Sequence, residues 1–439
     1  MIASPSHARP GAGVAPAPGP LRLRACAWLA GLLLGAFHGV IAISLGARAE
    51  GVPALVIALG LGMALGALVA RWPSDHLGRR PVNLASGLLI APAALGAALL
   101  PSPWSLAGAA IAGLGAGALL LVLPQIAHEL SLRGHRRLTP QALALIPAGA
   151  AASALICGWT PDAVMTAWLL VLGLGAVHAI LAAGLPESPV WNASRGRLEH
   201  SVAALKALHG PLEAAVAIDW VRLDAEMLAE QQPLTGTDLR VPQVRGAVLT
   251  GVVLVLAREA PLGAAALVLG LRAVADAVGA STAPTAWVLA LSVGWIAVSS
   301  LALLLVLRVD GLRFARIVLG VALAVLAATV LVASASAPTG AGRGAGATVG
   351  LLGLVAAQWI GVEPACRGAI DPRVPPWLVA AQRRATALGE SIARFVTILL
   401  PIVVVQGLGA ETAAYALLGL EALVLVVVLL RLPRSVIGG

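Results

Sequence analysis

Long apolar stretches alternate with short polar segments along almost the whole chain. Each stretch is long enough for a helix of roughly 20 residues to cross a bilayer. One set of six occupies 25–47, 53–71, 82–100, 104–127, 141–158 and 164–185; a second set of six occupies 246–271, 284–307, 315–336, 346–364, 386–406 and 412–430. The ten-residue alternation of barrel strands is absent from these stretches. The pattern predicts an all-α membrane protein of about twelve transmembrane helices.

A polar segment, 186–245, divides the two sets of apolar stretches. Apolar residues recur at helical spacing between Arg195 and about Leu228, which predicts short amphipathic helices lying under the bundle. The N-terminal residues are rich in Pro, Ala and Gly, which is typical of disorder. We therefore expect a disordered tail at 1–24, six-helix bundles at 25–185 and 246–431 joined by the 186–245 linker, and a short tail at 432–439.

Arginines are concentrated on one side of the predicted membrane. That side contains Arg22 and Arg24, Arg79 and Arg80, 133–137, the linker, 308–316, 367–384 and Arg431. The opposite loops hold little beyond Arg48, Arg272 and Arg343. Because cytoplasmic loops are enriched in Lys and Arg, both termini and the linker are expected in the cytoplasm.

The composition supports a membrane class and gives little support to an enzyme. Hydrophobic residues make up 59% of the chain and charged residues only 11%, with a mean hydropathy of +0.94. The net charge of +9 is explained by the arginine-rich loops, so we expect the lipid bilayer rather than nucleic acid as partner. The three cysteines are far apart, which argues against a disulfide framework or a metal cluster. No catalytic motif lies at a helix mouth, and we expect no cofactor.

A short polar motif, RWPSDHLGRRPVN, lies between the second and third apolar stretches. Asp75, Gly78, Arg79 and Arg80 in it resemble the loop signature of the major facilitator superfamily, although His76 replaces a basic residue. We expect Asp75 at the start of a helix, where the dipole favours a carboxylate. Gly78 would permit a tight turn, and the arginines would bind carboxylates of neighbouring helices. The alternative is an ordinary arginine-rich loop.

The segment PESPVWNASRGRLEH, residues 186–200, resembles the sugar porter branch of that superfamily. Related organic-ion and metabolite transporters share much of this pattern. Glu129, Arg133 and Gln141 resemble the family's region between the fourth and fifth spans. Val190 stands where the family usually has Arg, and the second-half motifs are degenerate.

The resemblance implies a gate of ion pairs at the cytoplasmic ends of the two halves. Such a latch needs only a few kcal/mol of differential stabilisation to shift the populations of two states. The expected gate and loop-signature residues of the first half and linker are Asp75, Gly78, Arg79, Arg80, Glu129, Arg133, Glu187 and Arg197. Those of the second half are Asp310, Arg316, Asp371 and Arg384.

The resemblance also bears on proton coupling. Proton-coupled sugar porters carry an Asp where this chain has Phe37, and an Arg where it has Ala109. The family's usual route for protons is therefore in doubt. His38 is a candidate proton site; the alternative is a polar residue hydrogen-bonded within the bundle.

Several polar residues inside apolar stretches are candidates for the substrate cavity, because intramembrane charges are costly and usually functional. They are Gln141, Arg258, Glu259, Glu390 and Arg394, with Phe395 beside them. The alternative for Glu390 and Arg394 is a structural pair four residues apart on one helix. A cavity with these charges favours a charged or zwitterionic solute over a sugar.

Together these patterns predict a monomeric multi-pass transporter in a bacterial plasma (inner) membrane. It would move a small polar metabolite, sugar-like or charged, by secondary active or facilitative alternating access. The preponderance of arginine over lysine, whose sole representative is Lys206, is the compositional hint of a bacterium. Two alternatives remain: a proton-coupled drug or metabolite efflux pump, and a degenerate, non-transporting membrane sensor or scaffold.

Overall fold

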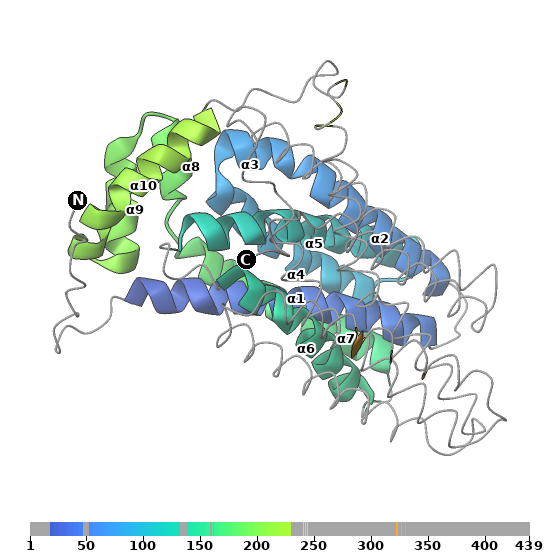
Figure 1. Cartoon of the computed structure of the whole chain (residues 1–439). Coiled ribbons are helices and arrows are strands. Elements are labelled where there is room, and N and C mark those ends of the chain that lie inside the picture. The colour runs from blue at the N-terminus through green and yellow to red at the C-terminus, as the bar shows by residue number, and fades with distance from the viewer. Residues whose placement is uncertain are drawn as a thin grey trace.

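The computed structural model describes residues 18–46, 52–131, 138–158, 160 and 162–229, together with a few isolated positions beyond them (Figure 1). All regular elements within these ranges are helices. All of the predicted second-half site residues lie outside the described part. They are Asp310, Arg316, Asp371, Arg384, Arg258, Glu259, Glu390, Arg394 and Phe395, and Arg133 of the first half also falls outside.

Among the described residues, seven helices precede the polar segment. They are α1 (Pro18–Gly46), α2 (Val52–Val69), α3 (Arg71–Leu77), α4 (Arg79–Leu99), α5 (Trp104–Glu129), α6 (Leu138–Gly158) and α7 (Ala163–Ala183). Helices α2 and α3 follow each other almost without interruption. The spans Leu21–Ile41, Ala54–Leu77, Arg79–Leu99, Trp104–Glu129 and Ala163–Ala183 are long and apolar enough to cross a membrane. These helices occupy the apolar stretches that the sequence predicts, with ends that differ by a few residues.

One difference concerns the N-terminal tail. Helix α1 begins at Pro18, so the prediction of disorder over 1–24 is wrong for residues 18–24. Leu23 is 3% exposed, and Arg22 donates from Nη1 to the carbonyl of Gly184 at 3.2 Å. The basic residues before the apolar run thus continue the helix, because one side of this turn packs on the bundle.

Small residues allow the helices of the bundle to approach closely. Gly62 and Gly66 of α2 face α5, and Gly113 and Gly117 of α5 face α2. A Cβ added at Gly117 would overlap the carbonyl of Met63, so the two backbones are in direct contact there. Close backbone approach at small residues is the usual way in which membrane helices pack.

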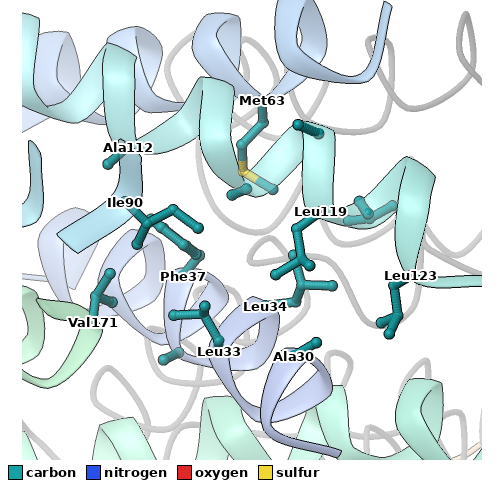
Figure 2. Close-up of a cluster of buried hydrophobic side chains, with 14 of the residues drawn as sticks. Ala30, Leu33, Leu34, Phe37, Met63, Ile90, Ala112, Leu119, Leu123 and Val171 are labelled. Carbon is teal, nitrogen blue, oxygen red and sulfur yellow. The ribbon is translucent and has the colours of Figure 1, made fainter. Parts of the chain in front are cut away.

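The centre of the bundle is filled by apolar side chains (Figure 2). Phe37 of α1 is fully buried among Leu34, Ile90 and Leu119 in this cluster, and its ring meets Trp168 edge-on at a centroid distance of 6.3 Å. Among the described residues, Arg79 is the buried side chain that carries a permanent charge. This part of the bundle core is therefore dry, and its charge lies near one end.

In the described part of the polar segment lie three further helices: α8 (Pro189–Ser194), α9 (Leu198–His209) and α10 (Pro211–Ala229). They gather at one end of the bundle, beside the start of α1 and near α3 (Figure 1). Apolar residues of the three helices form their own small core, made of Val190, Leu205, Ala214, Ala217, Val221 and Ala225. The amphipathic helices predicted for this segment are therefore present and packed together.

Candidate functional site

The first turn of α4 is the point where several segments of the chain meet. It follows Gly78 and lies against the end of α5 and the residues between α7 and α8. We call the polar side chains gathered here the α4-start network. Its members are Ser74, Asp75, Arg79, Glu129, Glu187 and Ser188.

The carboxylate of Glu187 closes the N-terminus of α4. Its Oε1 accepts hydrogen bonds from the backbone amides of Arg79 at 2.9 Å, Arg80 at 3.2 Å and Ser188 at 2.8 Å. The first amides of a helix have no partner inside the helix and lie at the positive end of its dipole, so a carboxylate is favoured there. Residues more than a hundred positions apart in the sequence are joined by this one group.

Gly78 makes room for that carboxylate. Its φ of 110° lies in a region that residues with a Cβ rarely adopt, and a Cβ there would also overlap the Glu187 carboxylate. The predicted role of Gly78 as a turn residue is confirmed.

Arg79 is buried, with 3% of its surface exposed, and its guanidinium contacts Glu129, Ser74 and Asp75. Nε donates to both carboxylate oxygens of Glu129, at 3.2 and 3.1 Å, and Nη1 donates to the Ser74 carbonyl at 2.8 Å. The hydroxyl of Ser188 donates a hydrogen bond to the same Glu129 carboxylate. Since Glu129 is only 12% exposed at its side chain, this pair is a largely desolvated ion pair that also satisfies its hydrogen bonds.

Asp75 does not begin a helix, and this expectation was wrong. It lies in the last turn of α3, with a side chain 51% exposed and Oδ1 3.5 Å from Arg79 Nη1. The carboxylate that lies at the start of α4 is instead that of Glu187, which is distant from α4 in the sequence. The backbone carbonyl of Asp75 accepts two hydrogen bonds, from Trp191 Nε1 at 3.0 Å and from Arg195 Nη2 at 2.9 Å.

The remaining arginines of this region have other contacts. Arg80 donates from Nη2 to the Ala183 carbonyl at 2.8 Å, at the end of α7. Arg197 lies over the Trp191 ring, with its guanidinium carbon 5.8 Å from the ring centroid, as does Arg195. Arg197 is thus placed by a cation–π contact on the surface of α8.

Ser188 and Ser74 were not among the predicted residues. Ser188 caps α8 by accepting from the Trp191 amide at 3.1 Å, and Pro189 follows it in the first turn. A Ser before a Pro is a recognisable helix start, so the sequence held a signal for the cap. Its second role, donating to Glu129, depends on tertiary packing and has no such signal.

Two predicted residues of the interior have partners within the bundle. Gln141, near the start of α6, accepts a hydrogen bond from Trp28 Nε1 of α1 at 3.2 Å. His38 Nδ1 lies 2.8 Å from the Leu34 carbonyl one turn earlier in α1. A carbonyl can only accept, so Nδ1 carries the hydrogen, which agrees with the alternative that His38 is a polar residue hydrogen-bonded within its helix.

A buried polar cluster that the sequence did not reveal joins α1, α4 and α7. His178 Nε2 lies 3.1 Å from Asn83 Oδ1, and His178 Nδ1 lies 3.8 Å from Cys26 Sγ. Asn83 Nδ2 donates to the same sulfur at 3.7 Å. Asn83 is one turn after Arg79, so this cluster holds α4 in register directly behind the α4-start network.

Known transporters resemble this chain in sequence. The family profile described as "Sugar (and other) transporter" matches residues 47–436. The chain is 30% identical over 202 residues to the D-xylose transporter of Levilactobacillus brevis. That alignment covers 43% of this chain and 44% of the other protein. It is 32% identical over 161 residues to the inner membrane metabolite transport protein YgcS of Escherichia coli (strain K12). That alignment covers 34% of this chain and 35% of the other protein. The chain thus spans less than half the length of these curated relatives.

A solved structure of the xylose transporter XylE from E. coli, in a partially occluded inward open conformation, has the same fold. The TM-score is 0.70 at 17% identity, and the match covers 94% of this chain and 100% of that one. Since another structure of XylE is described as a major facilitator superfamily protein, the likeness establishes the major facilitator fold for this chain. At this identity it establishes nothing about the solute.

The Arg79–Glu129 pair generates a stability prediction. Arg79→Gln leaves a largely desolvated Glu129 carboxylate unpaired, and we expect a loss of about 3–5 kcal/mol. Glu129→Gln is expected to cost a similar amount, whereas the double variant should recover part of the loss, because no unpaired charge remains. Melting in detergent, followed by tryptophan fluorescence, measures all three. Glu199→Gln, on the exposed first turn of α9, is the control. Strictly additive losses would contradict the pairing.

Proposed function

The chain belongs to the sugar (and other) transporter family, and we propose that it carries a small polar solute across a bacterial plasma membrane by alternating access. In this proposal two six-helix halves, twelve helices in all, rock about a solute site near the middle of the membrane. The observation that supports a moving transporter most strongly is the α4-start network, in which a desolvated arginine is held at the end of the bundle.

In this proposal, the first half contributes the α4-start network to the cytoplasmic gate. Arg79, Arg80, Glu129 and Glu187 bind one another and the surrounding backbone, which keeps this end of the first half rigid. The exposed carboxylate of Asp75 remains available for a partner in the second half. We assign that partnership to the second-half residues that the family resemblance places at the same level, which are Arg316 and Arg384 with Asp310 and Asp371 beside them. Arg133 would join the gate from the loop after α5.

The interior of the first half favours transport without proton coupling. Phe37 and Ala109 are both fully buried, and Phe37 is packed against Trp168 in an apolar cluster. The described carboxylates all lie near the ends of helices or in the linker, so this half places none in the middle of the bundle. Any carboxylate that couples protons would have to come from the second half, where Glu259 and Glu390 are the candidates.

The solute that we favour is a neutral polyhydroxy compound. Matched relatives include a D-xylose transporter, inositol transporter 4 and polyol transporter 5, the last two from Arabidopsis thaliana. Gln141 offers amide hydrogens for a hydroxyl group while its oxygen is held by Trp28. Arg258, Glu259, Glu390, Arg394 and Phe395 complete the proposed cavity from the second half, and they keep a charged solute as the competing possibility.

Uptake by the purified full-length protein in proteoliposomes tests the function. A panel of labelled pentoses, hexoses, polyols, inositol, amino acids and organic cations is offered with and without an imposed pH gradient. We expect saturable uptake and counterflow of at least one polyhydroxy solute, at a rate that the gradient leaves unchanged. Flux of cations that depends on the gradient would support the efflux alternative instead. No flux of any solute would support the sensor or scaffold.

The gate generates a second prediction, on the rate of transport. Glu187→Ala removes the acceptor of three amides, and charge-assisted hydrogen bonds contribute about 1.5–3 kcal/mol each. We expect the counterflow rate to fall by roughly tenfold or more, since a shift of 1.4 kcal/mol between states changes their ratio tenfold. Glu187→Gln, which keeps one acceptor oxygen, should lose less, and Glu199→Ala should transport normally. Equal rates in the wild type and the three variants would refute the gate. They would leave the assignment as a transporter unaffected.

A further inference from the structure

The C-terminal end of α7 attracts two arginines from two other helices. Arg80 of α4 donates from Nη2 to the Ala183 carbonyl at 2.8 Å, and Arg22 of α1 donates from Nη1 to the Gly184 carbonyl at 3.2 Å. The last carbonyls of a helix have no partner inside it and carry a partial negative charge, so cations are favoured there. Because the two acceptors belong to consecutive residues, both guanidiniums converge on one place.

Within the part of the chain that the structure describes, no carboxylate neutralises the positive charge of these two arginines. Among the described residues, neither guanidinium has a carboxylate at ion-pair distance. Glu187 lies close to the backbone of Arg80, but its carboxylate is occupied by the amides of Arg79, Arg80 and Ser188. The helix end supplies only about half a unit of negative charge. Two exposed cations thus share a site to which the described residues supply less than a full counter-charge.

The surface that leads to this site is apolar. Ile180 of α7 is 72% exposed and Val177 is 48% exposed, and both precede Ala183 and Gly184 at the three- and four-residue spacing of one helix face. Since α7 is long and apolar enough to cross a membrane, these exposed side chains offer a surface for lipid acyl chains. Leu21, beside Arg22 at the start of α1, is 71% exposed. An acyl chain lying along α7 would therefore end where the two guanidiniums begin.

Gly184 keeps the site open. A Cβ at this position would overlap the guanidinium of Arg22, so a larger residue would displace Arg22 from its present place at the helix end. Each guanidinium uses one of its nitrogens for a carbonyl and retains further N–H groups on an exposed side chain. Arginine N–H groups match phosphate oxygens in pairs, which makes this residue suited to phosphate.

We propose that Arg22 and Arg80 bind the phosphodiester of an anionic phospholipid at the cytoplasmic end of α7. The lipid's negative charge supplies the missing counter-charge, and its acyl chain covers Val177 and Ile180. A zwitterionic lipid fits less well, because its own cationic group offsets the phosphate. Basic pockets between membrane helices on the cytoplasmic side commonly bind such headgroups. The lipid would join α1, α4 and α7 directly beside the α4-start network.

Native mass spectrometry of the full-length protein in detergent measures this binding. Dioctanoyl-phosphatidylglycerol is titrated into the wild type and into Arg22→Gln, Arg80→Gln and Arg24→Gln. Arg24 is also exposed at the start of α1, but lies two residues from Arg22 and so on another side of the helix. We expect roughly fivefold weaker binding for Arg22→Gln and for Arg80→Gln, as is typical for the loss of one arginine near an anionic headgroup. Arg24→Gln should bind like the wild type.

Two further ligands identify what is recognised. Dioctanoyl-phosphatidylcholine should bind the wild type more weakly than the glycerol lipid, and glycerol 1-phosphate should not compete, because it lacks the acyl chain. Equal weakening by all three substitutions would mean a diffuse charge effect and would overturn the site. Unchanged binding in Arg22→Gln would do the same, even if Arg80→Gln fails to fold. Competition by glycerol 1-phosphate would assign the arginines to a soluble phosphate instead of a lipid.

Discussion

The structure of this end of the protein depends on one carboxylate, that of Glu187. It accepts the amides of Arg79, Arg80 and Ser188, and so joins the start of α4 to the segment between α7 and α8. Gly78 must lack a side chain for the carboxylate to enter, and its positive φ turns α3 into α4 at that point. The N-terminus of α4 in turn presents Arg79 to Glu129, the last residue of α5. Removing the anion would expose the amides and loosen each of these contacts.

The constraint behind this arrangement is the cost of a charge in a dry interior. Arg79 is buried, and the structure tolerates it because Glu129, the Ser74 carbonyl and Asp75 surround its guanidinium. Ser188 completes the hydrogen bonding of Glu129, and the Cys26–Asn83–His178 cluster holds α4 one turn deeper. Deeper still the bundle is apolar around Phe37. A desolvated ion pair beside a dry core is costly to break, so the pair holds this end of the first half in one arrangement.

The sequence predicted the helices, the family and most members of this network, for reasons that differ between residues. Apolar stretches of spanning length determine membrane helices with few alternatives, and the Asp75–Arg80 and PESP motifs identified the superfamily and its sugar porter branch, as the family match confirms. Asp75 was misplaced because the motif does not show where α3 ends. Ser188 as a partner of Glu129, and His178 as a partner of Asn83, could not be predicted, since each pair is made by tertiary packing across 59 and 95 residues. Gate contacts with the second half remain predictions.

The central claim, that the Glu187 carboxylate holds the start of α4, is tested most directly by hydrogen exchange. Amide exchange in a peptide covering the first turn of α4 would be compared between the wild type, Glu187→Gln, Glu187→Ala and the surface control Glu199→Ala. The account predicts that exchange at Arg79 and Arg80 accelerates in Glu187→Ala, less in Glu187→Gln and not in the control, because these amides lose their acceptor. Wild-type exchange at these two amides in Glu187→Ala would contradict it.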